Sequence, residues 1–466
     1  MAKAAHVYRC AECGWSTGKW VGRCGECQAW GSVEQAGAPR SNLVAVGPVS
    51  QTARPIGSVD LEAARSRPTG VSELDRALGG GLVQGAVILL AGEPGVGKST
   101  LLLDVAARWA ATAGRALYVT GEESAAQVRL RAERTDALAD GLFLAAETDL
   151  AAVLAQIERI APSLLVLDSV QTVSRADADG APGGVTQVRE VAAALIHTAK
   201  ERGMATILVG HVTKDGSIAG PRVLEHLVDV VLQFEGERHS RLRMVRTVKN
   251  RYGPADEVGC FDLSDTGITS MPDPTGLFLS RHADAVPGTC VTVTLEGRRP
   301  LLAEVQALVA ASSLAAPRRA TSGLDSARVA MVLAVLERRG AVALRNHDVY
   351  AATVGGARLA EPAGDLALMI AVASGAHDLP LPPGLVAIGE VGLAGEIRRV
   401  TGIQRRLAEA ERMGFTRALV PPDPGPVPAG IKVVEVGDVR AALVAARRPV
   451  PVARRAPTAR PVPAGP

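Results

Sequence analysis

The chain has 466 residues, of which 47% are hydrophobic and 21% charged, so it is long enough for two or three globular domains. The formal net charge is only +3, and five arginines lie within residues 447–466. Overall charge therefore does not indicate a nucleic-acid ligand; only local placement can. We expect no membrane-spanning helix and no secretory signal, because no long uncharged apolar run occurs and cysteines follow soon after Lys3. These features predict a cytoplasmic protein that does not associate with membranes.

Composition divides the chain into five predicted segments. Residues 1–31 are rich in cysteine and tryptophan, and residues 32–66 read as a linker because they are rich in Gly, Pro, Ser and Ala. Residues 67–270 and 271–446 are predicted to form two folded domains. The Arg/Pro/Ala-rich residues 447–466 are expected to be a disordered tail.

The first segment carries two Cys-x2-Cys pairs with ten residues between them: Cys10, Cys13, Cys24 and Cys27. Two such pairs can place four thiolates around Zn²⁺, and four protein ligands leave no open position, so the site is predicted to be structural. Two disulfides are the alternative, which a reducing cytosol disfavours. Aromatic and basic residues interleave with the cysteines. They either pack around a small core or form a surface that stacks bases or docks a partner: Tyr8, Trp15, Trp20, Trp30, Arg9, Lys19 and Arg23.

Alternating strand and helix signals begin at Thr69 and predict an α/β fold, a parallel sheet covered by helices. The apolar runs that read as its strands are Val87–Ala91, Ala116–Thr120, Leu164–Leu167 and Thr206–Gly210. Two more runs, Val228–Phe234 and Leu242–Val248, predict a hairpin that extends this sheet. The second domain has predicted strands at Thr289–Leu295 and Leu302–Leu308, and predicted helices at Ser326–Arg338, Asp365–Ser374 and Ile403–Met413.

A glycine-rich loop with the P-loop pattern GxxxxGK[ST] follows the first of these strands and precedes a helical segment. In such a loop, backbone N–H groups hold phosphates, Lys98 reaches the β- and γ-phosphates, and Ser99 binds Mg²⁺. The pattern in this context predicts an ATP site, formed by Gly92, Glu93, Pro94, Gly95, Val96, Gly97, Lys98, Ser99 and Thr100.

Polar residues end three of the predicted strands. Asp168 follows Leu164–Leu167 and is the expected Walker B carboxylate, which holds Mg²⁺ through water. Glu122 and Glu123 follow the strand that ends at Thr120, and an acid there can polarise the attacking water. We favour Glu122 slightly over Glu123; the alternative is an acid pair that stabilises a helix N-terminus. His211 is placed to sense the γ-phosphate.

This order of motifs resembles the RecA-like ATPase core. Together with the four-cysteine segment and the sequence Lys249, Asn250, Arg251, Tyr252 and Gly253, the chain resembles the bacterial RadA (Sms) recombination family, whose signature KNRFG has Phe where this chain has Tyr252. The resemblance covers the chain except the linker and tail. It implies a hexameric, DNA-stimulated, helicase-like ATPase that promotes branch migration in homologous recombination and DNA repair beside the RecA recombinase.

The resemblance also implies roles for individual residues. Lys249 and Arg251 would reach across a subunit interface to the γ-phosphate of the neighbouring subunit; the alternative is an ordinary basic turn. Two loops, 171–186 and 213–223, would face single-stranded or branched DNA in a ring channel. Their flexible backbone and few cations suit contact with phosphates regardless of base sequence, and the candidate contacts are Lys214, Arg222, Arg175 and Arg189.

From about residue 280 the chain resembles the proteolytic domain of the Lon family. Ala363 stands where that family has its catalytic serine, and Gln404 stands where it has its lysine. Since neither residue can act as nucleophile or base, we expect an oligomerisation domain and a further DNA platform rather than a peptidase. The basic candidates for that platform are Arg298, Arg299, Arg398, Arg399, Arg405 and Arg406, the last two alternatively lying on a solvated helix face.

A signalling ATPase of the KaiC type is a further alternative, because it shares the fold and a Glu-Glu pair. The single phosphate loop, the cysteine segment and the motif 249–253 argue against it.

Overall fold

The computed structural model describes residues 7–36, 55–58, 61–211, 222–236, 241–280 and 285–448. The chain divides into two compact units, Met1–Asp60 and Leu61–Pro466. Most of the predicted linker and nearly all of the predicted tail lie outside the described residues. In this part of the chain, no helix is both long and apolar enough to cross a membrane.

The first unit contains a small three-stranded antiparallel sheet. Its strands are β1 (Val7–Cys10), β2 (Ser16–Thr17) and β3 (Val33–Ala36), in the order β2-β1-β3. Cys10, Cys24 and Val33 form its buried centre. Because β3 pairs with β1, the module extends beyond the predicted boundary at residue 31.

The second unit begins with a nine-stranded sheet in the order β14-β13-β12-β11-β6-β10-β9-β7-β8. Strands β11, β6, β10, β9, β7 and β8 are mutually parallel, while β12 to β14 continue the sheet in antiparallel fashion. The strands are β6 (Val87–Gly92), β7 (Ala116–Thr120), β8 (Leu142–Ala146), β9 (Leu164–Asp168), β10 (Ala205–His211), β11 (Val230–Glu235), β12 (Leu242–Asn250), β13 (Val258–Ser264) and β14 (Gly267–Ser270). The predicted strands and the β11–β12 hairpin are confirmed, whereas β8, β13 and β14 had not been predicted.

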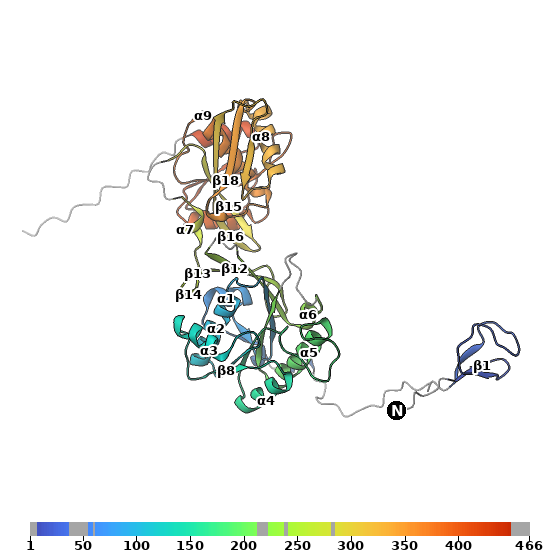
Figure 1. The fold of residues 1–466 in the computed structure, drawn as a ribbon. Coiled ribbons are helices and arrows are strands. Elements are labelled where there is room, and N and C mark those ends of the chain that lie inside the picture. Colours follow the sequence, from blue (N-terminus) through green and yellow to red (C-terminus); the bar gives the residue numbers. More distant parts are fainter. Residues whose placement is uncertain are drawn as a thin grey trace, which may run out of the picture. The chain divides into compact units, whose positions relative to one another are not determined.

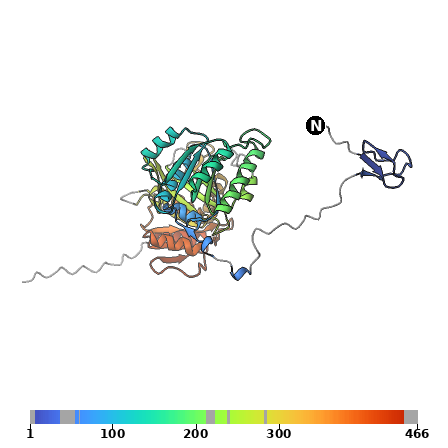
Figure 2. The same cartoon turned by 90° about the horizontal axis from the view of Figure 1, so that it is seen from below.

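Helices cover both faces of this sheet (Figures 1 and 2). Alternate residues of β6 enter two separate cores. Ile88 and Leu90 belong to the core that also contains α2, and Val87 and Leu89 belong to the core that contains α5. This two-sided burial explains why the strands read as continuous apolar runs. The helices are α1 (Ser72–Leu78), α2 (Lys98–Thr112), α3 (Ala125–Arg134), α4 (Leu150–Ile160), α5 (Val185–Arg202) and α6 (Arg222–Leu227).

A seven-stranded mixed sheet forms the C-terminal part, in the order β17-β18-β16-β15-β19-β22-β23. Its strands are β15 (Thr289–Glu296), β16 (Arg299–Ala311), β17 (Arg319–Ser322), β18 (His347–Thr353), β19 (Leu385–Ala387), β22 (Arg417–Val420) and β23 (Lys432–Glu435). Its helices are α7 (Thr275–Phe278), α8 (Ser326–Gly340), α9 (Asp365–His377), α10 (Ile403–Arg412) and α11 (Val439–Arg447). Residues 365–374 of α9 are all buried, which fits a central helix that is apolar on every side.

Short elements complete the described residues: two two-stranded antiparallel sheets and four 3-10 turns. β4 (Ser66–Arg67) pairs with β5 (Leu82–Val83) across α1, and β20 (Glu390–Val391) forms a hairpin with β21 (Ile397–Arg398). An ion pair joins the two sheets within the second unit. Arg299 of β16 pairs with Glu73 of α1, and both side chains are buried. Glu73 also accepts a hydrogen bond from the Cys260 N–H of β13. The C-terminal part therefore contacts the nine-stranded sheet at the antiparallel strands of that sheet.

Candidate functional site

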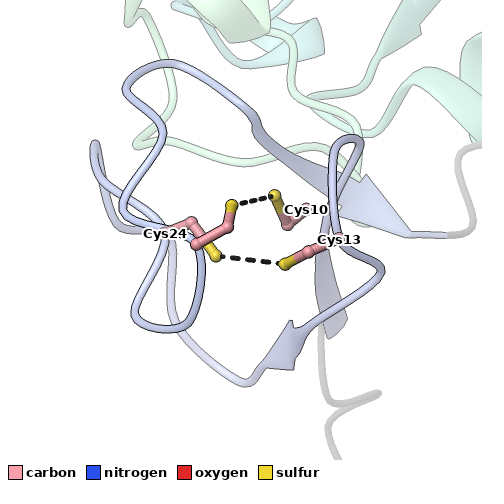
Figure 3. Close-up of side chains that lie close together, drawn as sticks. Cys10, Cys13 and Cys24 are labelled. Atoms are coloured by element: carbon pink, nitrogen blue, oxygen red, sulfur yellow. Dashed lines mark hydrogen bonds between the residues drawn. The ribbon is translucent and has the colours of Figure 1, made fainter.

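The four cysteines of the first unit converge, and Figure 3 labels three of them, Cys10, Cys13 and Cys24. All four Sγ atoms lie within 4.8 Å of one another, with Cys10 and Cys27 Sγ 3.7 Å apart and Cys13 and Cys24 Sγ 3.6 Å apart. A tetrahedral Zn²⁺ with bonds of about 2.3 Å to sulfur places its ligands roughly 3.8 Å apart, whereas a disulfide requires about 2.0 Å. The arrangement therefore fits a metal ion and not two disulfides.

Neighbouring groups favour the thiolate form of Cys10, whereas burial and hydrogen bonds with the other three cysteines raise the pKa of Cys27. The Ser32 hydroxyl lies 3.2 Å from Cys10 Sγ and, with nearby backbone N–H groups, lowers the pKa of that thiol to about 6.

The aromatic residues of the first unit divide into two sets. Tyr8 and Trp15 are part-buried against the small core, which confirms one of the two interpretations for them, while Trp20 and Trp30 are exposed.

The phosphate loop joins β6 to α2 at the carboxyl end of the parallel strands. Gly95 and Gly97 have φ angles of +80° and +110°, which residues with side chains rarely adopt. Gly97 precedes the first residue of α2, so the unpaired N–H groups at the helix start lie next to the loop. This is the backbone arrangement that binds phosphate.

Lys98 is buried at the start of α2, and its Nζ donates hydrogen bonds of 2.8 Å to the carbonyl oxygens of Gly92 and Glu93. Burial lowers the pKa of Lys98, while the negative charges of Asp168 and Glu122 oppose that shift. A buried cation thus lies between the loop carbonyls and the acids at the strand ends. Phosphate oxygens can replace those carbonyls as its acceptors.

Asp168 ends β9 beside β7, and its Oδ2 accepts a 2.7 Å hydrogen bond from the Tyr118 hydroxyl. Tyr118 lies within β7 and is buried, and burial raises the pKa of its phenol. We had not predicted this residue. A tyrosine inside an otherwise apolar strand was the available signal, since a buried phenol needs a hydrogen-bond partner.

The two adjacent glutamates have different surroundings. Glu122 Oε1 accepts 2.7 Å hydrogen bonds from Ser169 Oγ and lies 2.7 Å from His211 Nε2. Burial acts to raise the pKa of Glu122, but these two neighbours outweigh it and lower the pKa overall. Glu123 instead pairs with Arg131 of α3. The structure therefore brings Glu122 and His211 together beside the Walker B strand and turns Glu123 toward a helix.

The motif 249–253 ends β12 and makes contacts within its own chain. Lys249 Nζ donates to the carbonyl oxygens of Glu225 and Val228, at 2.7 and 2.8 Å, where α6 ends. Arg251 lies 3.2 Å from Asp229 Oδ1. Burial lowers the pKa of Lys249. Both cations thus have partners near α6, and their predicted reach toward a neighbouring subunit stays a prediction.

The other residues of the motif fix the turn. Asn250 Nδ2 donates to the Leu78 carbonyl at 3.0 Å, and its Oδ1 accepts from the Tyr252 N–H at 2.9 Å. The Tyr252 hydroxyl accepts a 3.3 Å hydrogen bond from Lys200 Nζ. A phenylalanine at position 252 would lack this hydroxyl.

Half of the predicted DNA contacts can be placed. Arg175 pairs with Asp177 at 2.6 Å and lies 3.5 Å from Glu190, while Arg189 is exposed on α5. Lys214 and the side chain of Arg222 lie outside the described residues. The buried Gln187, which we had not predicted, holds the first loop: its Nε2 donates to the Ala178 carbonyl at 2.7 Å, and its Oε1 accepts from the Arg175 N–H at 2.9 Å.

Comparison with known proteins agrees with this geometry. Residues 8–35 match a family described as a rubredoxin metal binding domain, and residues 52–217 match a family described as an AAA domain. Over 452 residues the chain is 57% identical to the DNA repair protein RadA of Mycolicibacterium smegmatis, covering 95% of this chain and 97% of that protein. The chain belongs to the RadA family of DNA repair proteins.

Two further RadA relatives align over similar lengths. The protein of Mycobacterium tuberculosis is 57% identical over 95% of this chain and 93% of its own length. The protein of Pseudomonas aeruginosa is 48% identical over 95% of this chain and 99% of its own length. The fold is thus an α/β AAA-type core that binds ATP, with a four-cysteine ribbon before it and a mixed sheet after it. An AAA domain in this family implies ATP hydrolysis.

The C-terminal part places Ala363 in a buried turn before α9, with 1% of its surface exposed. Gln404 lies on α10 and donates a 2.9 Å hydrogen bond to the Pro424 carbonyl. Two charged groups near these positions, Glu361 and Arg406, form a bidentate ion pair with 2.6 Å for each contact. Burial alone would raise the pKa of Glu361, but Arg406 lowers it overall.

The prediction of a basic DNA platform is wrong for two of its six arginines. Arg406 is completely buried and Arg299 is 4% exposed, so neither can contact DNA. Arg406 binds Glu361 and carbonyl oxygens inside the domain, and Arg299 binds Glu73. For Arg406 the alternative of a solvated helix face is wrong as well. The periodicity of α10 could not reveal the burial of Arg406, because an arginine in a helix is expected to be exposed.

Proposed function

We propose that this protein is a DNA-dependent, helicase-like ATPase that drives branch migration of recombination intermediates during homologous recombination and DNA repair. It acts on single-stranded and branched DNA, works with the RecA recombinase and assembles as a hexameric ring. The observation that carries the proposal is the placement of Glu122, Ser169 and His211 beside the phosphate loop, in a chain 57% identical to RadA proteins over 95% of its length.

In this proposal, the phosphate loop and Lys98 hold the phosphates of ATP. Ser99 at the start of α2 and Asp168 at the end of β9 would hold Mg²⁺, which neutralises phosphate charge when bound. Tyr118 keeps the Asp168 carboxylate in place. The Glu122 carboxylate, which Ser169 and His211 hold beside the Walker B strand, can orient the attacking water and accept its proton.

Movement along DNA by a ring also requires that each subunit respond to the nucleotide bound by its neighbour. We propose that Lys249 and Arg251 supply that link in the ring. To do so they must leave the α6 carbonyls and Asp229, which now hold them. Release of α6, which directly follows residues 212–221, would then connect the neighbour's nucleotide to a predicted DNA loop.

The decisive experiment measures DNA-stimulated ATP hydrolysis and branch migration on a synthetic branched substrate. The wild type is expected to hydrolyse ATP faster with single-stranded DNA and to migrate the branch. ATP hydrolysis without any effect of DNA would refute the motor. Mixing Lys98→Ala with Lys249→Ala tests the link in trans: two variants that are inactive alone should regain part of the hydrolysis in mixed rings. Absence of recovery would contradict the role of Lys249.

We further propose that the ribbon holds Zn²⁺ through its four thiolates. Cys27→Ser should release the metal, which a colorimetric zinc assay detects, and should reduce branch migration more than basal ATP hydrolysis. Ser16→Ala, which keeps all four ligands, is the matched control. Unchanged zinc content in Cys27→Ser would contradict the site.

We also propose that the C-terminal part is a non-proteolytic domain similar to that of Lon proteases. Its support is that Ala363 and Gln404 occupy the positions of the nucleophile and base. ATP-dependent cleavage of casein by the wild type would overturn this.

A further inference from the structure

Strand β12 lies between the ATP-binding core and the C-terminal part, and its alternate residues face opposite sides. Leu242 and Met244 pack in the small core that also contains Phe278 and Leu301. Val245 belongs instead to the core of the ATP-binding sheet. Arg243 shares the face of Val245, so a guanidinium points into the ATP-binding core.

Arg243 reaches the phosphate loop from this position. It is only 6% exposed, and its Nε–H donates a 2.9 Å hydrogen bond to the Val96 carbonyl oxygen. Its Nη1 donates to the Leu242 carbonyl, also at 2.9 Å. Val96 lies between Gly95 and Gly97, the two loop residues with positive φ. The strand at whose end the family motif lies therefore contacts the centre of the loop.

The geometry of one peptide unit explains the effect of the hydrogen bond from Arg243 to the Val96 carbonyl. The Val96 C=O and the Gly97 N–H belong to the same trans peptide and point in opposite directions. When Arg243 draws the carbonyl toward β12, the Gly97 N–H faces away from β12. In a P-loop, such N–H groups hold the phosphates. A glycine-rich loop has many other backbone conformations, and a hydrogen bond from outside the loop favours this one.

Gly236 provides room for the arginine. A Cβ atom at residue 236 would lie 2.3 Å from Arg243 Cδ and 2.8 Å from Arg243 Nε. These distances are far inside van der Waals contact, so alanine at this position must displace the Arg243 side chain. Gly236 does not have a positive φ, and its backbone therefore tolerates alanine.

We propose that Arg243 is a positioning residue for nucleotide binding, which fixes the phosphate loop through the Val96 carbonyl and adds a buried positive charge behind it. It contacts the loop and not the reacting atoms. Arg243 therefore governs affinity for the phosphates of both ATP and ADP, and acts on the hydrolytic step less than on binding.

The test compares Arg243→Gln with Arg241→Gln in the full chain. Arg241 lies next to the same strand and pairs with Asp262 at 2.5 Å, but its side chain is 66% exposed, so it is a matched control. Binding is measured with a fluorescent ADP analogue and Mg²⁺, together with kcat and KM for ATP. We expect Arg243→Gln to weaken ADP binding and raise KM by about 10- to 100-fold, with a much smaller change in kcat.

Two other variants separate positioning from folding. Arg243→Lys should recover part of the affinity, because its ammonium can reach the same carbonyl, and Gly236→Ala should lose affinity while Arg243 itself is retained. Thermal unfolding without nucleotide reports stability independently. Nucleotide binding by Arg243→Gln equal to that of Arg241→Gln, or by Gly236→Ala equal to the wild type, overturns the proposal. Failure of the wild type to respond to DNA would refute the motor and leave this inference standing.

Discussion

The phosphate-loop site and the Glu361–Arg406 cluster both hold charged side chains in buried surroundings, but they satisfy them differently. Lys98 binds two loop carbonyls, which ligand oxygens can replace. Arg406 binds both oxygens of Glu361 and the carbonyls of Val293 and Thr401, so its donors are used inside the domain. A charged cluster therefore indicates a ligand site only when its partners can be exchanged for the ligand.

The largest expected effect is at Lys98. Lys98→Ala removes the cation that reaches the phosphates and should reduce ATP hydrolysis by on the order of 10²-fold or more. A phosphate-release assay at saturating ATP measures it. Arg406→Leu should have a much smaller effect on hydrolysis per folded molecule. If the two variants lost hydrolysis equally, the two regions would not differ as described.

Glu122→Gln sharpens the assignment within the first region. It should slow hydrolysis by on the order of 10²- to 10⁴-fold, because the amide cannot accept the proton of water. Nucleotide binding should persist, as measured by fluorescent ADP. Glu123→Gln is the matched control and should change the rate far less, since Glu123 pairs with Arg131. A reversed order would assign the base to Glu123.

In the second region the main effect is on stability. Arg406→Leu leaves the Glu361 carboxylate without its charged partner and should lower the free energy of unfolding by about 3–5 kcal/mol. Replacing both residues by leucine should recover part of that loss, because no unpaired charge is then buried. Urea unfolding followed by circular dichroism measures both. A double variant no more stable than Arg406→Leu would argue against the ion pair as the cause.

The same pair predicts the smallest effect, a pH dependence. Arg406 lowers the pKa of Glu361 below the ordinary 4.5 of a glutamate. The ionised carboxylate therefore stabilises the fold above about pH 4.5, and this contribution is lost as the pH falls through the lowered pKa. In urea unfolding from pH 7 to pH 3, the stability difference between wild type and Glu361→Gln should shrink toward the acid end. A constant difference would contradict this.

Local patterns were enough to predict much of the ATP-binding part. The phosphate loop, the carboxylate at Asp168 and the strand runs are features of neighbouring residues, and the strands lie where the apolar runs predicted them. Strands β8, β13 and β14 were missed. The last two are partly polar and extend the sheet beyond β12 by antiparallel pairing. Tyr118 was missed because its partner Asp168 is distant in sequence. Gln187 was missed because its partners are backbone groups of a loop, which no pattern of side chains reveals.

The sequence by itself determined that four thiolates and a phosphate loop exist, since spacing within a short segment is a property of the chain. Only the tertiary structure decided which of Glu122 and Glu123 lies beside Ser169 and His211. The two adjacent side chains point in different directions from the turn after β7, and Glu123 contacts Arg131 instead. It also decided that Arg299 and Arg406 are buried and that Arg243 grips the phosphate loop. From the sequence alone, an arginine is expected to lie on the surface. Whether its side chain is buried, and which groups it then binds, is decided only when strands distant in sequence pack together.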